Sequence, residues 1–197
     1  MKRLTLALAA LVMLTAGEPS PPATLVIADS NPVGNSWVTM LGPNCTPDVW
    51  AWGGVGVFWG SSTYAGGISL SNHYETILAD RPGAHVAVML GTNDAVHTNQ
   101  PIPTVAQLNT LAGQMVSAGA ASVRWVTIPP LADTQPTAKR QRVADWNAAI
   151  LATPNAVDLR SALGSTLDPS ERVDSIHLSP EGHGALAYVA AGSPICQ

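Results

Sequence analysis

LVIADSNPVG (residues 25–34) begins as an apolar run of strand-forming residues and ends abruptly in small, polar and turn-forming ones. A strand that stops in this way places its last side chains at the edge of a sheet. In open α/β sheets the ligand crevice lies outside the carboxyl ends of the strands. Ser30 follows the strand just as the chain turns, so it is a candidate nucleophile. A serine hydroxyl is a weak nucleophile, and the hypothesis therefore requires a base and an oxyanion site elsewhere in the chain.

The composition indicates one globular domain. The chain has 197 residues, of which 46% are hydrophobic and only 11% are charged. This length and composition are sufficient to form a buried hydrophobic core. The formal net charge is −4 and no run of Lys or Arg occurs, which argues against nucleic acid and anionic membrane surfaces as partners. We expect a monomer.

The first residues have the layout of a secretory signal. Lys2 and Arg3 precede an apolar stretch at residues 4–16, and small residues and prolines follow up to Ala23. The apolar stretch is shorter than the roughly 20 residues of a transmembrane helix, so we expect no stable membrane insertion, with an uncleaved anchor as the alternative. We therefore interpret residues 1–23 as a signal peptide with a short Pro-rich leader, and residues 24–197 as one secreted domain.

Export changes the interpretation of the two cysteines, Cys45 and Cys196. An oxidising compartment permits a disulfide between them, which we favour over two free buried thiols. In the chain-entropy model a loop of this length stabilises the fold by roughly 4–5 kcal/mol. Two cysteines without a histidine cluster do not make a zinc site.

The rest of the chain alternates between strand-like and helix-like segments. Strands are expected at residues 24–29, 48–52, 85–90, 122–128 and 156–159. Helices are expected at residues 35–41, 69–80, 105–118, 138–151 and 179–190. Strands separated by helices of this length imply a parallel sheet with helices on both faces. The predicted fold class is α/β, a three-layer α/β/α sandwich with a parallel sheet of about five strands.

Asp174 and His177 form the most informative polar pair, since they stand three residues apart just before the last expected helix. A catalytic histidine needs one ring nitrogen free as a base and the other held by a carboxylate. A turn can bring both side chains to one side, although this spacing alone is common. His183 on the following helix is interpreted as a surface or packing histidine.

Two further stretches could face the same crevice. Asn93, in the sequence GTND directly after the third strand, carries a neutral amide that can donate hydrogen bonds to an oxyanion, or it can simply form a turn. Asp94 is interpreted as a structural cap or turn residue. The glycine-rich segment at residues 53–56 offers backbone N–H groups, or a simple tight turn. A third glycine for a dinucleotide fingerprint, a G-x-S-x-G elbow and an H-E-x-x-H motif are all absent.

Taken together and in this order, the motifs resemble those of the SGNH hydrolases, also called GDSL esterases or lipases. Ala28-Asp29-Ser30 stands where the family has G-D-S, and Gly34 falls four residues after the serine, as in the family. Residues 91–94 match its G-x-N-D motif, and residues 174–177 match its D-x-x-H motif. The resemblance covers about residues 24–190 and implies the family's flavodoxin-like fold.

Two features depart from the family pattern. Ala28 replaces the first glycine of G-D-S, a small change that leaves the serine usable. The family's asparagine ahead of the glycine motif is absent, which leaves the oxyanion glycine ambiguous. Gly56 fits the spacing best, while Gly60 and Gly67 remain alternatives.

The resemblance implies acyl transfer to water without a metal or a cofactor. Ser30 attacks an ester carbonyl, His177 acts as base and then acid, and Asp174 orients the imidazole. The backbone N–H groups of Ser30 and Gly56 hold the oxyanion with the side chain of Asn93. The implied substrates are small-molecule or glycan esters with acetyl or short acyl chains, or lipids.

Two alternatives remain open. The tryptophans at positions 50, 52 and 59 suggest a catalytically weak relative that binds carbohydrate or cell-wall material, although packing is their simpler role. An acyltransferase would use the same triad with an alcohol as acceptor.

Overall fold

The computed structural model describes residues 23–30, 36–43, 45–62, 65–96 and 100–196. Within this part the chain forms one five-stranded sheet with the strand order β2-β1-β3-β4-β5, in which every neighbouring pair is parallel. The strands are β1 (Thr24–Ala28), β2 (Asp48–Ala51), β3 (His85–Met89), β4 (Ser122–Val126) and β5 (Ala156–Val157). The predicted parallel sheet is confirmed, and β5 is two residues shorter than expected.

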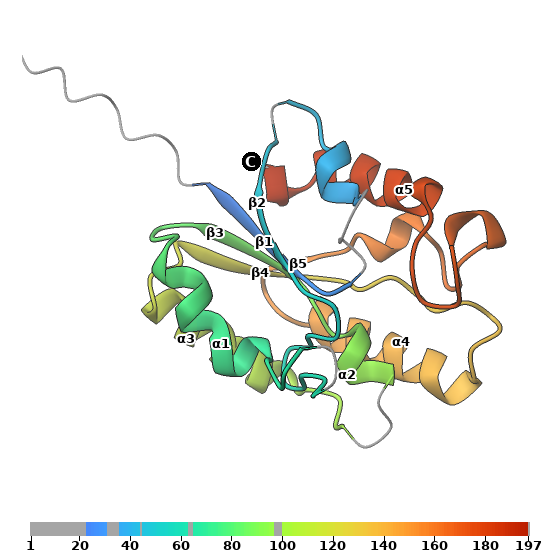
Figure 1. Cartoon of the computed structure of the whole chain (residues 1–197), viewed down its shortest axis with the longest axis horizontal. Coiled ribbons are helices and arrows are strands. Elements are labelled where there is room, and N and C mark those ends of the chain that lie inside the picture. Colours follow the sequence, from blue (N-terminus) through green and yellow to red (C-terminus); the bar gives the residue numbers. More distant parts are fainter. Residues whose placement is uncertain (1–22, 31–35, 44, 63–64, 97–99, 197) are drawn as a thin grey trace, which may run out of the picture.

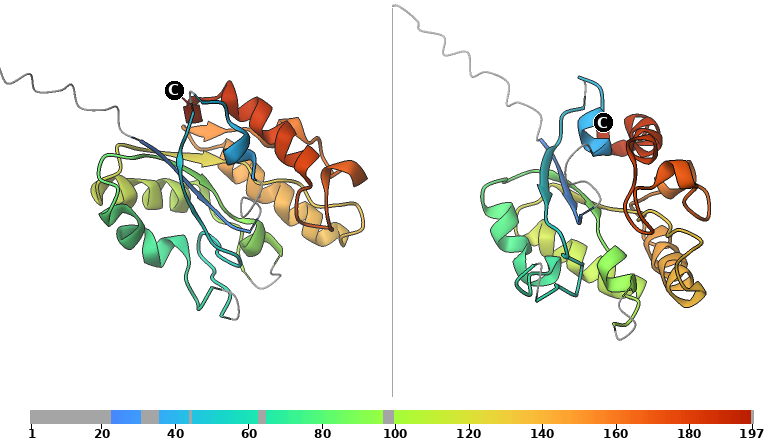
Figure 2. Two further views of the ribbon diagram at one scale, coloured as in Figure 1. Left: turned by 45° about the horizontal axis from the view of Figure 1, so that its top comes forward. Right: turned by 45° about the vertical axis from the view of Figure 1, so that its right-hand side comes forward.

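Helices cover both faces of the sheet (Figures 1 and 2). On one face lie α1 (Leu70–Ala79), α2 (Thr92–Val96), α3 (Val105–Ser117) and α4 (Thr137–Leu151). The other face is covered by α5 (Pro180–Ala191) and by the 3-10 helix η1 (Trp37–Met40), together with the short 3-10 helices η2 (Arg160–Ala162), η3 (Pro169–Glu171) and η4 (Pro194–Cys196). The three-layer α/β/α sandwich is therefore confirmed.

Each face of the sheet has its own hydrophobic core, because successive side chains of a strand point to opposite faces. Leu25 and Ile27 of β1 pack with the helices α1, α3 and α4, and Trp146 is fully buried there. Val26 and Ala28 pack with Trp37 and with α5 on the other side. Both faces of β1 are buried, as expected for the interior of a parallel sheet.

The helices begin where local chemistry satisfies their first N–H groups. Thr104 caps α3 and Gln107 reaches back to the Thr104 N–H, which completes a capping box. Ser179 caps α5 by accepting from the Gly182 N–H, and Pro180 occupies the first turn as predicted. These caps place the loops before α3 and α5 at the sheet edge where the strands end.

The sequence did not predict α2. Residues 92–96 follow β3 so closely that the segment was expected to be a turn, yet they form a short helix that contacts α4. Asn93 and Asp94 therefore lie on a helix, where their positions are fixed by its packing.

Several expectations fall on residues outside the described part. They include the predicted leader up to residue 22 and Gly34 of the first motif. The side chain of Cys196 also lies outside it, so the pairing with Cys45 stays a prediction. In the described residues no helix is long and apolar enough to cross a membrane.

Candidate active site

The strand order places the site at one edge of the sheet. In the order 2-1-3-4-5 the connections leave β1 and β3 in opposite directions, which opens a crevice outside their carboxyl ends. Ala28 at the end of β1 pairs with Ala51 of β2 and with Met89 of β3. The three strands therefore end at one level, and the segments that follow them meet at this edge.

Ser30, His177 and Asp174 are brought together across the sheet edge. The Ser30 Oγ lies 2.9 Å from the His177 Nε2, although 147 residues separate the two in the chain. The His177 Nδ1 lies 2.7 Å from the Asp174 Oδ2. In the tautomer that donates its Nδ1–H to Asp174, the Nε2 is left to accept the proton of Ser30.

Asp174 is held by its own loop. Its Oδ1 accepts from the backbone N–H groups of Ile176 and His177, each at 2.7 Å. Burial acts to raise the pKa of this carboxyl, but the hydrogen bonds from the His177 ring and from these N–H groups hold it below its ordinary value. Asp174 is therefore an anion at neutral pH and can orient the His177 ring by accepting its Nδ1–H.

The loop that carries His177 is fixed to two neighbouring segments. The Ser175 carbonyl accepts from the Ala132 N–H at 3.1 Å, and the Ser175 hydroxyl accepts from the Gln135 side chain at 2.6 Å. On its other side, the Val173 N–H donates to the His177 carbonyl at 3.0 Å. The loop that carries His177 is thus supported by the backbone that follows β4 and by a hydrogen bond of its own to Val173.

Asp94 fixes the glycine loop that follows β2. It is 1% exposed, and its carboxylate accepts from the backbone N–H groups of three consecutive residues, Val57 at 2.7 Å and Phe58 and Trp59 at 2.9 Å. Burial raises the pKa of Asp94 to about 6, against the opposing effect of these three donors. The sequence indicates a cap or turn residue at position 94. The structure shows instead that Asp94 joins α2 to residues 57–59, more than 30 residues away in the chain, and we call these three hydrogen bonds the Asp94 clamp.

Gly56 lies at the start of this clamp and has no room for a side chain. A Cβ there would overlap the Asp94 carboxylate and the Trp59 carbonyl oxygen. The Asn93 side chain donates to the carbonyl of the preceding residue, Val55, at 2.9 Å. Asn93 and Asp94 thus both bind the loop, one on each side of Gly56.

The placement of Gly56 as an oxyanion donor rests on its motif. The Val55–Gly56 peptide is trans, so its N–H points away from the carbonyl that Asn93 holds. The N–H of Gly56 and the Asn93 amide are therefore not aimed at one point. Gly53 is the loop glycine beside Ser30, since a Cβ built there would lie 4.0 Å from the Ser30 Cβ. Of the alternatives, Gly60 packs against residues 67 and 68 just before α1, while Gly67 belongs to that segment and has nothing within 4 Å of a Cβ built there.

The remaining predicted residues have structural surroundings. His183 is buried and its Nδ1 accepts from the Trp37 N–H at 3.3 Å, while burial lowers its pKa. The expectation of a packing histidine is confirmed. Trp50 packs against the core and tilts over His73, with the ring centroids 6.2 Å apart. Trp52 differs, because half of its side chain is exposed.

Trp52 stands at the same sheet edge as the nucleophile. Its backbone N–H donates to the Ala28 carbonyl at 3.3 Å, two residues before Ser30. An exposed indole here can contact a substrate, which the sequence suggested only through a cluster of tryptophans. Among the described residues no group of three His, Cys, Asp or Glu side chains could hold a metal ion.

Comparison with known proteins assigns the family. The model of the GDSL-like lipase/acylhydrolase family matches residues 14–185. The chain belongs to this family. It is a carboxylic ester hydrolase of the SGNH type, as its sequence motifs predicted. No curated protein sequence matches the chain.

Solved structures share the fold at low sequence identity. Est24, a carbohydrate acetylesterase from Sinorhizobium meliloti, aligns with a TM-score of 0.70 and 18% identity over 86% of this chain and 96% of its own. The aryl esterase of M. smegmatis aligns with a TM-score of 0.64 and 18% identity over 86% and 97%. Axe2, an acetylxylan esterase from Geobacillus stearothermophilus, aligns with a TM-score of 0.60 and 16% identity over 85% and 91%.

Gly56→Ala tests the clamp of this hydrolase. The added methyl group must displace the Asp94 carboxylate or the Trp59 carbonyl. Displacing Asp94 moves the amide of the neighbouring Asn93, so we expect ester hydrolysis to fall by about 10²–10³-fold, the typical cost of losing one oxyanion donor. Gly42→Ala is the matched control, because nothing lies within 4 Å of a Cβ there. Initial rates on p-nitrophenyl acetate measure both variants, and a Gly56→Ala enzyme as active as Gly42→Ala would contradict the clamp.

The pKa of Asp94 predicts a pH-dependent stability. The folded pKa of about 6 exceeds the ordinary 3.8, so between these values the folded state holds a proton that the unfolded chain lacks. Relative to Asp94→Asn, the free energy of unfolding of the wild type should rise as the pH falls from about 6 to 4, by at most about 1.4 kcal/mol per unit. Urea denaturation of both proteins from pH 7 to 4 measures the difference. A difference that stays constant or falls on acidification would rule out a raised pKa.

Proposed function

We propose that the chain is a serine esterase whose triad is Ser30, His177 and Asp174. The observation that carries this proposal is the continuous chain of hydrogen bonds from the Ser30 hydroxyl through the imidazole to a carboxylate, with distances of 2.9 and 2.7 Å. Family membership supports it, because the three residues stand at the family's G-D-S and D-x-x-H motifs. The geometry supplies a nucleophile, a base and a group that orients the base.

The reaction proceeds in two halves. The Ser30 Oγ attacks the ester carbonyl as His177 takes its proton at Nε2, and the resulting imidazolium then protonates the leaving alcohol. Asp174 remains an anion and stabilises the imidazolium through the Nδ1–H. Water, deprotonated by the same nitrogen, then attacks the acyl-enzyme and releases the acid and free Ser30.

The developing oxyanion requires donors that are already in place. We assign the backbone N–H of Ser30 and the Asn93 amide to this role. An amide group has two donor hydrogens, and the bond to Val55 uses one of them. Gly56 is left out of this assignment, because its N–H and the Asn93 amide are not aimed at one point, and its oxyanion role stays a prediction from the motif.

We further propose that the substrates are acetyl or short-chain acyl esters, including esters of carbohydrates. Structural neighbours named as a carbohydrate acetylesterase and an acetylxylan esterase support this choice, and the exposed Trp52 beside Ser30 offers a flat apolar surface for the alcohol part. The signal-like sequence of residues 1–23 supports export of the enzyme. In an oxidising compartment, Cys45 and Cys196 would form a disulfide.

The triad predicts a strongly non-additive loss of activity. Ser30→Ala and His177→Ala should each lower kcat on p-nitrophenyl acetate by about 10⁴-fold or more, and the double variant should lose no more than either single one, because the two residues act as a unit. Asp145→Asn, an exposed acid on α4, is the control and should retain full activity. Losses that multiply in the double variant would contradict a shared step.

The nature of the acceptor separates an esterase from an acyltransferase. Turnover of p-nitrophenyl acetate is measured with and without 1 M of a simple alcohol, and the acetate and acetyl ester formed are quantified. If the enzyme is a hydrolase, acetate should remain the main product when the alcohol is present, because water accepts the acetyl group. Dominant formation of the new ester would instead assign the enzyme to the acyltransferases.

A further inference from the structure

A groove between α1 and α3 is separate from the triad and uses no residue of the proposed mechanism. The two helices lie side by side on the same face of the sheet (Figure 1). Two adjoining cavities of about 250 and 500 Å³ lie along them and share Thr110 and Gln114. Phe58 lines the first cavity and Tyr74 the second, so an aromatic ring stands in each half of the groove. The second cavity is also lined by Glu75, whose carboxylate accepts from the Tyr74 hydroxyl at 3.4 Å and disfavours an anionic ligand there.

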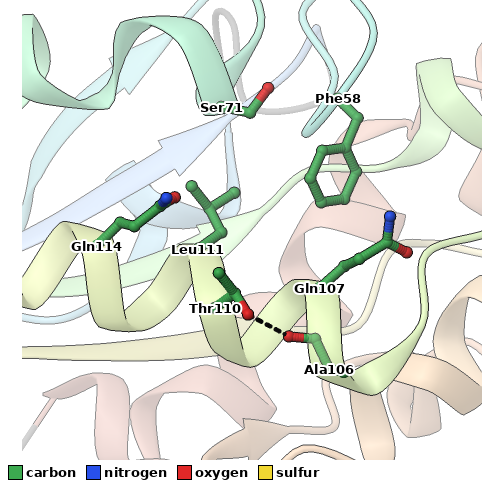
Figure 3. Close-up of a pocket in the computed structure, with 7 residues that line it drawn as sticks. All are labelled: Phe58, Ser71, Ala106, Gln107, Thr110, Leu111 and Gln114. Carbon is green, nitrogen blue, oxygen red and sulfur yellow. Dashed lines mark hydrogen bonds between the residues drawn. The ribbon is translucent and has the colours of Figure 1, made fainter.

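The chemistry of the first cavity is neutral and amphipathic. Figure 3 shows the ring of Phe58 directed toward α3, with Gln107 and Thr110 on the helix below it and Ser71 opposite on α1. None of the seven described residues that line this cavity is charged. Three are apolar and four carry an amide or a hydroxyl: Ser71, Gln107, Thr110 and Gln114.

These polar groups are spaced along one side of α3. Positions 107, 110 and 114 recur at three- and four-residue intervals, which puts their side chains on one stripe of the helix. All three residues are exposed, while Leu108, Leu111 and Met115 of the same helix face the core. The exposed stripe therefore presents the Gln114 amide and the NH₂ group of Gln107, whose oxygen serves the capping box. Between them lies the Thr110 oxygen, whose hydrogen is donated to the Ala106 carbonyl.

The groove begins at the edge of the sheet that carries the site. Phe58 stands two residues after Gly56, so its backbone lies within about 7 Å of that glycine along the chain. The Phe58 N–H donates to the carboxylate of the buried Asp94 at 2.9 Å, which fixes the backbone that carries the ring. Because α1 and α3 follow strands of a parallel sheet, both helices run away from this edge, and the groove runs with them toward Tyr74 and Ser117.

We propose that this groove binds a neutral saccharide chain, which continues from the sugar whose ester lies at Ser30. Sugar rings combine apolar faces, which pack on aromatic rings, with a rim of uncharged hydroxyls that pair with amides and hydroxyls. The first cavity is smaller than the roughly 300–1,000 Å³ of sites for drug-sized ligands and suits a single ring, and the second extends it. This inference rests on the proposed ester hydrolysis in one respect, since that reaction is what places an esterified sugar at Ser30. Binding of the saccharide in the groove does not depend on it.

The chemistry argues against a long acyl chain as the occupant. A fatty acyl chain has no groups to pair with the NH₂ groups of Gln107 and Gln114, and burying these against it would leave them unsatisfied. The hydroxyls of Ser71 and Thr110 already bond within the protein and do not add to this cost. Most of the lining surface of the first cavity is apolar and comes from Phe58, Ala106 and Leu111 with the aliphatic parts of the polar side chains, so the two amides decide between a sugar and an acyl chain.

Binding of ester-free hexasaccharides tests the groove apart from the catalysis. Cellohexaose, xylohexaose and chitohexaose are titrated into the full chain by calorimetry, with wild type, Phe58→Ala and Gln114→Ala. We expect at least one of them to bind, and each variant to weaken that binding by roughly three- to tenfold, the scale of one aromatic or hydrogen-bonding contact. Tyr188→Ala is the matched control, because Tyr188 is 84% exposed on α5 across the sheet, and it should leave binding unchanged.

Gln114→Ala guards against a folding defect, since Gln114 is exposed and alanine is a strong helix former. These ligands carry no ester, so binding does not depend on Ser30, and failure of the triad would leave this test standing. The inference is overturned if none of the three sugars binds, or if Phe58→Ala and Gln114→Ala bind as tightly as the wild type.

A kinetic arm places the groove relative to the site. The ratio of kcat/KM for acetylated xylohexaose to kcat/KM for p-nitrophenyl acetate should fall roughly three- to tenfold in Gln114→Ala, and the loss should appear in KM. An unchanged ratio would show that the groove does not serve the ester site. A selective loss of activity on p-nitrophenyl decanoate would instead assign the groove to an acyl chain and overturn the proposal.

Discussion

The parallel register of β1 between β2 and β3 is the constraint on which the site depends. Ala28 pairs with Ala51 on one side and with Met89 on the other, so the three strands stop at the same level. Directly after the ends of these strands come Ser30, the glycine-rich loop at residues 53–56 and Asn93. A shift of one residue along any strand would move its end by about 3.3 Å and turn its side chains to the other face. The 2.9 Å hydrogen bond between the Ser30 Oγ and the His177 Nε2 would be lost after such a shift.

A buried charge provides the second constraint. Asp94 is 1% exposed, and three consecutive backbone N–H groups bind its carboxylate. Taking a carboxylate out of water is costly, and these donors offset part of that cost. The same bonds fix the loop that holds Gly56 and Phe58, so the edge of the active site and the start of the groove share one anchor. The pKa of Asp94 is raised because the three donors offset only part of the cost of burying its charge.

Much of the fold was predictable because the buried strands are short, apolar and β-branched, and because helix caps are local. Ser179 and Pro180 mark the start of α5 in the sequence itself. The helix α2 was not predictable, since five residues carry too little periodicity and its packing on α4 is long-range. The Ser30, Asp174 and His177 side chains were found from motifs, but their meeting depends on loops separated by 147 residues. Asp94 was interpreted as a turn residue because its three partners lie in a distant loop, and no local signal marks such a clamp.

The central claim is that the Ser30 hydroxyl, activated by His177, forms a covalent acyl-enzyme. The most direct measurement is peptide mapping by mass spectrometry after reaction with a fluorophosphonate, which modifies an activated serine. We expect one adduct per chain on the peptide that contains Ser30, and none when His177 is replaced by alanine. An adduct on another serine, or equal labelling of Ser30→Ala, would contradict it.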